Sequence, residues 1–425
     1  MPEFLTLLPP DEARDLMLSH LASRKPKLDS ESINVISSLN RTLAQDILAP
    51  HPLPDFQRST VDGYAVRASD THGASDSLPA YLTLIGEVPM GDAPSFEIGQ
   101  GQCALIHTGG MLPNGANAVV MLEYTQQTSE VSKDFGSLNT EIEISRAAAD
   151  GENVIRIGED VAQGQLVLPK GTLIRPAEIG GLMALGITKV DVAKKIRVGL
   201  ISTGDEVIDP SESPRPGQVR DINSYTLGAL IEKSGGVAKR YGIISDQFQA
   251  LKEAAAKALS ECDVVIITAG SSASTRDMTA DVIRQLGEPG VLVHGINTRP
   301  GKPTILGVCN EKAVIGLPGN PVSALVNGYL FVVPVIDKLL GTLPKPKATV
   351  QAELTVNLSS QAGREDWWPV KLIVNRQSSI VNYNADPIFG KSNLIFTLAS
   401  ADGLLRIHPD ATGLSAGELV EVILI

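Results

Sequence analysis

The stretch AVIGLPGNPVS, residues 313–323, connects an apolar run to an apolar helix through a stiff turn. The run at 313–317 predicts a buried strand, and a long helix is expected from Val322 onward. Two prolines flank the Gly-Asn pair between them, so the turn is rigid and presents backbone N–H groups at the start of the helix. This pattern of strand, turn and helix is typical of α/β domains.

Residues upstream of this stretch continue the same alternation. RVGLIS (197–202) and DVVIIT (263–268) are short continuous apolar runs, and helical patterns separate them. One of these helices is expected to begin at Asp246, with Asp246 as its N-cap. Strands without polar alternation are buried on both faces, so we predict a doubly wound parallel sheet in a domain over residues 183–341.

The chain changes character on both sides of this domain. Residues 1–182 form an N-terminal and linker region, in which 51–145 is rich in glycine, proline and short β-prone runs and predicts a β insertion. A helix is expected at 32–39 in the same region. A Pro/Lys linker ends the α/β domain, and the alternating apolar residues of 346–425 predict a C-terminal β-barrel.

Composition excludes several classes of function. With 4% aromatic residues and a net charge of −12, the 425-residue chain lacks the features of a nucleic-acid or anionic-membrane surface. No continuous apolar run approaches the about 18 residues of a membrane helix, and the N-terminus does not resemble a signal peptide. Three widely spaced cysteines indicate reduced thiols, so we expect a cytoplasmic protein.

Three expected strand ends carry unusual loops, and ligands of doubly wound sheets bind at this edge. After RVGLIS come Gly204, Asp205 and Glu206, and adjacent carboxylates on a glycine turn suit a hard cation such as Mg²⁺. The same residues also fit a helix start with solvated acids. After DVVIIT, the small residues of 268–277 could cradle a phosphate with N–H and hydroxyl groups, or form a flexible serine-rich connection.

The third loop is the GLPGNPVS turn itself, with RPGKP (299–303) expected beside the same sheet edge. Arg299 and Lys302 would place two cations near the turn, where they could bind a phosphate-bearing ligand or remain solvated surface charges. Common nucleotide and metal motifs are absent: there is no G-x-G-x-x-G after a strand, no P-loop and no H-E-x-x-H.

These loops together resemble the molybdopterin-binding domain shared by molybdopterin-inserting and molybdopterin-adenylylating proteins. Three further segments are similar to the molybdopterin molybdenumtransferases, the MoeA and gephyrin E-domain family. They are PLPDFQRSTVDGYAV (52–66), IHTGGMLPNGANAVVMLE (106–123) and GENVIRIGEDVAQGQLVLPKG (151–171). The resemblance covers nearly the whole chain in order. It implies insertion of molybdate into adenylylated molybdopterin with release of AMP, in molybdenum cofactor biosynthesis.

The resemblance also implies a homodimer whose active sites combine the α/β domain of one subunit with the β insertion of the other. Asp62 and Asp160 would act from the partner subunit as catalytic groups, with Thr108 and Glu123 binding substrate. Asp205 and Glu206 would be catalytic on the α/β domain and, with Asp277, would hold Mg²⁺. The other substrate-binding residues implied are Ser271, Ser272, Arg299, Lys302, Pro318, Asn320, Pro321 and Ser323.

The resemblance implies further partners, and one loop of this chain departs from the family's sequence pattern. Molybdate would bind at Arg299 and Lys302, and a molybdopterin adenylyltransferase would supply the substrate. The family loop usually reads like Ser-Gly-Gly-Val-Ser-Val-Gly-(Asp/Glu)-x-Asp, whereas residues 269–279 read AGSSASTRDMT. Two glycines are replaced, Arg276 is added, and the spacing of the acidic residues that ends at Asp277 is altered. A tungstate-preferring homologue and a gephyrin-like scaffold are the alternatives, because the fold alone does not establish catalysis.

Overall fold

The computed structural model describes residues 7–22, 29–128, 140–269, 273–376 and 383–425, with the side chains of 273–277 also outside the description. The chain divides into two compact units. The larger unit comprises Met1–Gln45, Lys170–Arg175 and Lys189–Ile425, and the smaller unit comprises Asp46–Pro169 and Pro176–Thr188.

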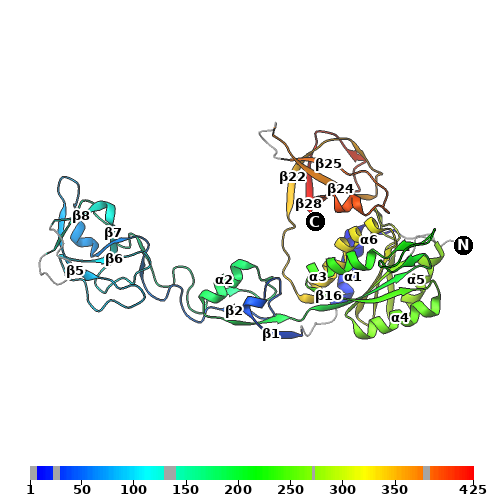
Figure 1. The fold of residues 1–425 in the computed structure, drawn as a ribbon, viewed down its shortest axis with the longest axis horizontal. Coiled ribbons are helices and arrows are strands. Elements are labelled where there is room, and N and C mark those ends of the chain that lie inside the picture. The colour runs from blue at the N-terminus through cyan, green and yellow to red at the C-terminus, as the bar shows by residue number, and fades with distance from the viewer. Residues whose placement is uncertain (1–6, 23–28, 129–139, 270–272, 377–382) are drawn as a thin grey trace. The chain divides into compact units, whose positions relative to one another are not determined.

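A six-stranded sheet is the centre of the larger unit, in the order β16-β13-β17-β21-β20-β18 (Figure 1). The first four strands are parallel, and β20 and β18 are antiparallel to their neighbours. The strands are β13 (Ile196–Thr203), β16 (Gly236–Ile244), β17 (Val264–Ala269), β18 (Pro289–His294), β20 (Ile305–Cys309) and β21 (Lys312–Pro318). The doubly wound domain is therefore confirmed, although its sheet is mixed and β20 had no counterpart in the sequence prediction.

Helices cover both faces of this sheet, as the continuous apolar strands require. One apolar cluster joins the sheet to α1, α3, α6 and α7, and a second joins the opposite face to α4 and α5 (Figure 1). The helices are α1 (Pro10–Ala22), α3 (Asn223–Lys233), α4 (Phe248–Glu261), α5 (Ala273–Leu286), α6 (Pro321–Asn327) and α7 (Val333–Leu340). The two-residue strands β14 (Val207–Ile208) and β15 (Val219–Arg220) pair with each other beside this sheet.

Two local predictions were wrong. Asp246 does not cap α4, which begins at Phe248 after Gln247. The helix expected at 32–39 is instead strand β1 (Ser30–Asn34) followed by a 3₁₀ turn at Val35–Ser37. β1 pairs with β12 (Lys189–Ala193), so hydrogen bonds to a distant segment override its helical pattern.

The helical run Pro321–Leu340 comprises α6, a π-helical turn at Gly328–Val332, and α7. By length and composition it could cross a membrane, a feature that the search for uninterrupted apolar runs missed. Sixty-one per cent of its most apolar window is buried inside the structure, as in the core helix of a domain. One such helix is weak grounds for a membrane span.

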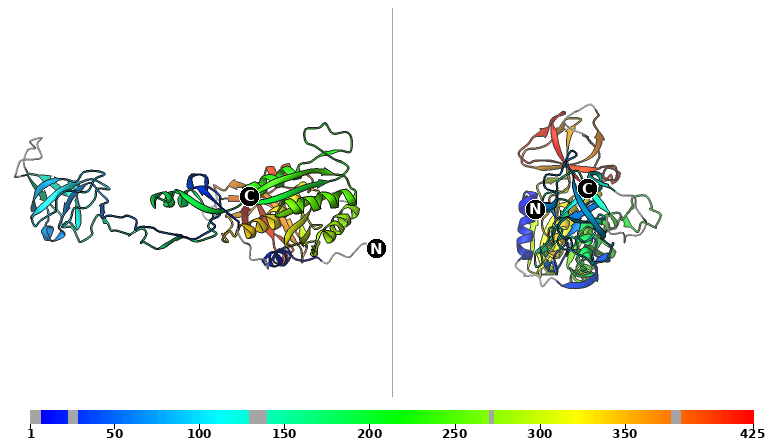
Figure 2. Two further views of the ribbon diagram at one scale, coloured as in Figure 1. Left: turned by 90° about the horizontal axis from the view of Figure 1, so that it is seen from below. Right: turned by 90° about the vertical axis from the view of Figure 1, so that its left-hand side faces the viewer.

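The C-terminal strands form a separate β domain within the larger unit, drawn in orange and red in Figure 2. Its sheet order is β24-β25-β22-β28-β26, and an additional pairing of β24 with β26 closes the expected barrel. Its main strands are β22 (Thr349–Leu354), β24 (Glu365–Val374), β25 (Tyr383–Pro387), β26 (Gly403–Ile407) and β28 (Leu419–Leu424). Strand β19 (Thr298–Arg299) of the α/β domain adds to β24, so the two domains share a sheet edge.

The smaller unit is built on a mainly antiparallel sheet in the order β7-β4-β6-β5-β9-β8. Those strands are β4 (Gly63–Val66), β5 (Ala80–Glu87), β6 (Gln102–Ile106), β7 (Ala118–Met121), β8 (Thr125–Gln127) and β9 (Glu141–Ile144). The short pairs β2 (Ile47–Leu48) with β11 (Leu166–Leu168) and β3 (Arg58–Ser59) with β10 (Val154–Ile155), and helix α2 (Pro176–Ala184), complete it.

Candidate functional site

A pocket of about 370 Å³ lies at the carboxyl ends of the parallel strands β13 and β17, beside the turn that follows β21. We call it the strand-end pocket. Its polar lining comes from Ser202, Thr203, Glu206, Arg220, Asp221, Asn223, Thr268, Asn320 and Asn393, with Pro321 at the start of α6. The pocket is therefore at the sheet edge where doubly wound domains bind their ligands.

Carboxylates meet beside the strand-end pocket. Asp205 and Glu206 are exposed on the loop after β13, and the Asp246 backbone N–H donates to Asp205 Oδ1 at 3.2 Å. Burial raises the pKa of Asp246, and the negative charges of Asp205 and Glu206 raise it further. Oδ1 of Asp246 is buried and has no hydrogen-bond partner among the described residues. This concentration of negative charge is the environment that a bound cation would relieve.

The carboxylates of Asp205 and Glu206 suit Mg²⁺ as part of its coordination shell. Within the described part of the chain, no group of three His, Cys, Asp or Glu side chains is arranged to hold a metal ion. Mg²⁺ commonly uses one or two carboxylates and takes its remaining ligands from substrate phosphates and water. Asp205 and Glu206 at the edge of a pocket fit that arrangement, whereas they do not form a complete protein cage.

We expect Asp246→Asn to stabilise the Mg²⁺-free protein at neutral pH. The raised pKa of Asp246 means that its carboxylate is disfavoured in the folded state, and this penalty is complete above the raised pKa. The penalty disappears below the ordinary carboxyl pKa, because Asp246 is then protonated in both states. Melting temperatures of both proteins between pH 4 and pH 8 should converge as the pH falls. An equal or lower melting temperature for the variant at pH 7 would contradict the expectation.

Two residues of this pocket had no place in the sequence prediction. Asp221 is buried and accepts hydrogen bonds from the hydroxyls of Ser202 at 2.8 Å and Ser224 at 2.6 Å. Asn223 donates from Nδ2 to the Gly319 carbonyl at 2.8 Å, which fixes α3 to the Gly-Asn turn. Oδ1 of Asn223 is buried and unpartnered among the described residues, so it is available to a donor on a ligand. The Asp-x-Asn-Ser spacing at a helix start was the available signal.

A larger pocket of about 700 Å³ lies between the RPGKP loop and the C-terminal domain. We call it the basic pocket. Arg299, Lys302, Arg364 and Lys391 line it, together with Pro318, Asn320, Ser323 and Ser392 and the carboxylate of Asp366. Asn320 and Asn393 line both pockets, so the two adjoin at the Gly-Asn turn. The structure thus brings Arg299 and Lys302 to the same turn as the predicted Pro318, Asn320, Pro321 and Ser323.

The RPGKP loop is held tightly against α6. Asn327 donates from Nδ2 to the Pro300 carbonyl at 3.2 Å and to the Ser323 carbonyl at 2.7 Å. Gly301 has φ +106°, and a Cβ there would meet the Asn327 amide at 1.7 Å. Only glycine fits this approach, so the loop places its two cations reproducibly. Arg364 and Lys391 come from the C-terminal domain, and no local pattern linked them to Arg299.

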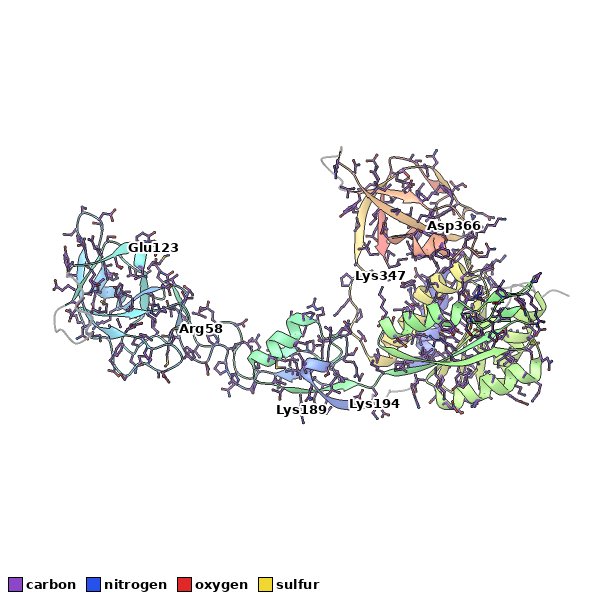
Figure 3. The ribbon with its side chains drawn as sticks, viewed as in Figure 1. Arg58, Glu123, Lys189, Lys194, Lys347 and Asp366 are labelled. Carbon is purple, nitrogen blue, oxygen red and sulfur yellow. The ribbon has the colours of Figure 1, made fainter. Side chains whose placement is uncertain are left out.

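The smaller unit brings two of the predicted residues together. Asp62 Oδ1 accepts from the Thr108 backbone N–H at 2.7 Å and from its hydroxyl at 3.1 Å. These hydrogen bonds lower the pKa of Asp62, with a smaller contribution from His107. Glu123 follows directly after Leu122, whose N–H donates to the Asp62 carbonyl at 3.2 Å, and Figure 3 shows Glu123 beside the smaller unit's sheet. Asp160 is exposed, and its N–H donates to the Leu53 carbonyl at 3.1 Å.

The remaining predicted residues belong to the loop after β17. Ser271 and Ser272 lie outside the described residues, as do the side chains of Arg276 and Asp277. Their roles stay predictions. The backbone of α5 from Ala273 shows that this loop leads into a helix, as expected.

A doubly wound domain with carboxylates and a stiff Gly-Asn turn at its strand ends belongs to the class of α/β domains that bind ligands at this edge of the sheet. Family models match the chain in three parts: the MoeA N-terminal region at 8–186, a probable molybdopterin-binding domain at 199–338, and the MoeA C-terminal region at 351–425. The chain belongs to the MoeA family.

Individual relatives agree with this assignment. The chain is 38% identical over 405 residues to a putative molybdopterin biosynthesis protein of Methanocaldococcus jannaschii, covering 93% of this chain and 92% of the relative. It is 32% identical over 426 residues to the molybdopterin molybdenumtransferase of Bacillus subtilis, covering 100% and 96%. The solved molybdopterin biosynthesis MoeA protein of Pyrococcus horikoshii OT3 is 34% identical, with a TM-score of 0.83 and coverage of 99% of this chain and 100% of that one.

Proposed function

We propose that the protein is a molybdopterin molybdenumtransferase, which inserts molybdate into adenylylated molybdopterin and releases AMP during molybdenum cofactor biosynthesis in the cytoplasm. The observation that carries this proposal is the pair of adjoining pockets at the Gly-Asn turn. Glu206 and Asp221 line the first together with Arg220, and four cations line the second together with Asp366. The reaction combines two anions, a phosphate-bearing pterin and a metal oxyanion, which require different binding environments. Two adjoining pockets of different charge suit that pair.

The strand-end pocket would hold the phosphate side of the pterin. Asp205 and Glu206 would bind Mg²⁺ there, with Asp277 as a further ligand, and the metal would neutralise the phosphate charge during loss of AMP. Asn223 and Asn320 supply amide groups to the pocket wall, and Pro321 begins α6 beside them. A molybdopterin adenylyltransferase would deliver the substrate.

The basic pocket would hold molybdate. Arg299 and Lys302 are exposed on the fixed RPGKP loop, and Ser323 is buried at the first turn of α6. Arg364 and Lys391 add two cations from the C-terminal domain. Charge-assisted hydrogen bonds from such groups are the strongest available to a dianion.

We expect the protein to be a homodimer in solution. Leu48 on β2 and Leu166 on β11 are cross-strand neighbours whose exposed fractions are 56% and 49%, and Met183 on α2 is 41% exposed. Paired apolar side chains on a surface favour a protein interface. In such a dimer the partner subunit would supply Asp62, Thr108, Glu123 and Asp160. Light scattering at micromolar concentration measures the mass, and an active monomer would contradict the expectation.

The direct test supplies adenylylated molybdopterin, molybdate and Mg²⁺ to the purified protein and measures AMP release and bound molybdenum. The proposal predicts AMP and inserted molybdenum in equal amounts, both dependent on Mg²⁺. Substituting tungstate distinguishes a tungstate-preferring enzyme. Binding of the pterin without any AMP release would reject the transferase and favour a gephyrin-like scaffold.

A further inference from the structure

Asp366 lies in the basic pocket as a fully buried carboxylate on β24, and Figure 3 shows it in the C-terminal domain. A buried carboxylate among cations is unexpected in a pocket for anions, because it opposes their charge. Its partners explain the placement. Arg364 donates to Asp366 through Nε at 2.6 Å and through Nη2 at 2.9 Å. This bidentate ion pair restricts the orientation of the guanidinium group.

Asp366 also faces Arg299 from the other domain. The register of β19 against β24 pairs Arg299 with Asp366, and Arg299 Nη1 lies 3.8 Å from Asp366 Oδ2. The Arg299 guanidinium is additionally 5.5 Å from the ring centroid of Trp368, within the range of a cation–π interaction. One buried carboxylate therefore fixes Arg364 by two hydrogen bonds and lies within ion-pair distance of Arg299, an arginine of the other domain that lines the same pocket.

We propose that Asp366 is a positioning residue, which orients Arg364 and Arg299 as a pair to receive the tetrahedral oxyanion. This inference rests on the proposed function and adds to it. An arginine has five N–H groups, and Arg364 uses two on Asp366 and a third, at 3.5 Å, on Gln361. Two remain for a ligand, and their directions are set by the Asp366 pair. An unrestrained arginine would lose side-chain entropy on binding the anion.

Two effects of removing the Asp366 charge oppose each other. Coulombic repulsion between Asp366 and a bound anion would fall, which by itself tightens binding. The orientation of both guanidinium groups would be lost, which weakens binding. We expect the second effect to dominate, because the Arg364 pair already neutralises most of the Asp366 charge at the anion. Positioning and plain electrostatics therefore predict opposite signs.

The test measures the dissociation constants of molybdate and of sulfate by calorimetry for the wild type and Asp366→Asn. We expect weaker binding of both anions by about tenfold or more, the worth of a charged hydrogen bond. In turnover, the KM for molybdate should rise with little change in kcat, since oriented binding is lost and not the chemistry. Asp366→Glu restores a carboxylate and should recover part of the affinity.

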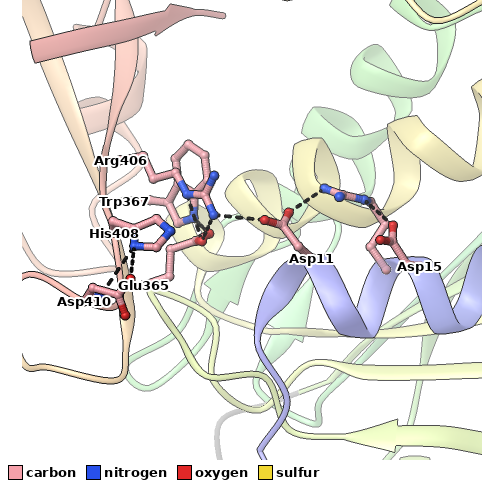
Figure 4. Close-up of polar contacts among 8 residues, drawn as sticks. Asp11, Asp15, Glu365, Trp367, Arg406, His408 and Asp410 are labelled. Atoms are coloured by element: carbon pink, nitrogen blue, oxygen red, sulfur yellow. Dashed lines mark hydrogen bonds and ion pairs between the residues drawn. The ribbon is translucent and has the colours of Figure 1, made fainter.

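Glu365→Gln is the matched control. Glu365 immediately precedes Asp366 on β24, is also buried, and pairs with Arg406, which lies outside the basic pocket (Figure 4). A glutamine keeps an oxygen that accepts the hydrogen bond from Trp367 Nε1, the side-chain partner of Glu365 that lines the pocket. The substitution should cost stability without changing anion affinity. If Asp366→Asn does not fold, Arg364→Lys serves as the test variant, because lysine keeps the positive charge but cannot form a bidentate pair with Asp366. Weakened affinity is again expected, and unchanged affinity would overturn the inference.

The outcomes separate this inference from the function on which it rests. Unchanged or tighter anion binding by folded Asp366→Asn, in a wild type that binds molybdate and turns over, overturns the positioning role alone. Equal weakening in Asp366→Asn and Glu365→Gln also overturns it, since the effect would then be structural. A wild type that binds no molybdate overturns the oxyanion pocket and the positioning role together.

Discussion

Glu206→Ala is expected to reduce Mg²⁺-dependent AMP release by about 100-fold or more, the scale on which an electrostatic group of a catalytic site acts. Glu206 lines the strand-end pocket on an exposed loop after β13, where it packs into no apolar core. Its removal should therefore change the melting temperature little, since exposed substitutions away from special features are nearly neutral. Loss of turnover with an intact fold is the combination that places Glu206 in the reaction.

The measurement compares initial rates of AMP release over a Mg²⁺ titration with melting curves of the same preparations. Glu212→Ala is a suitable control, because Glu212 is also an exposed acid on the segment after β13 but does not line the pocket. It should turn over like the wild type. Normal turnover by Glu206→Ala would remove Glu206 from the site, and a large fall in its melting temperature would make it structural.

Arg406→Ala is expected to lower the free energy of unfolding by about 3 kcal/mol, the lower end of the range for breaking a buried ion pair. Arg406 pairs with Glu365 and donates to Asp11 of α1 at 3.0 Å (Figure 4). The Glu365 side chain is 2% exposed, and it also accepts from Trp367 Nε1 at 2.7 Å. Without Arg406, Glu365 would remain as a buried charge with only a neutral donor. The effect is at the lower end because the Arg406 side chain is 34% exposed.

Urea unfolding of the larger unit, followed by tryptophan fluorescence, would measure this loss, because Trp367 lies next to Glu365. Arg14→Ala is the control. Arg14 also pairs with Asp11, at 2.9 Å, but Asp11 is 52% exposed, so the expected cost is below about 1 kcal/mol. Equal effects of the two substitutions would show that the Glu365 pair contributes no more than a surface pair. Burial raises the pKa of Asp11, but Arg14 and Arg406 lower it by more, so the pKa lies below its ordinary value. The ion pairs of Asp11 should therefore stabilise the fold at neutral pH and lose this contribution only as the pH falls into the acid range.

The sequence was sufficient wherever structure follows from neighbouring residues. The apolar runs 197–202 and 263–268 correspond to strands β13 and β17. They could be recognised because a strand buried on both faces consists of consecutive apolar residues. The GLPGNPVS turn and the Asp205-Glu206 pair could be assigned to the ligand edge for the same reason, since each directly follows such a strand. The resemblance carried by 52–66 and 106–123 then indicated the family to which the chain belongs.

Prediction failed where a distant segment decides the structure. Residues 32–39 have a helical pattern, yet hydrogen bonds to β12, more than 150 residues away in sequence, make Ser30–Asn34 a strand. Strand β20 pairs antiparallel with β21 and β18. Its apolar run of residues is short and ends at a turn, so the sequence pattern did not distinguish it as a strand. Local propensity is worth only fractions of a kcal/mol per residue, so tertiary pairing readily overrides it.

The candidate site divides in the same way. The sequence by itself determined which loops carry carboxylates, cations and the stiff turn, because each motif is short and continuous. Only the tertiary structure decided that Asp246 joins Asp205, that Arg364 and Lys391 line one pocket with Arg299, and that Asp366 faces Arg299 across two strands. The physical reason is that charge interactions depend on distance in space, and folding brings these groups within a few ångströms although the chain separates them by tens of residues.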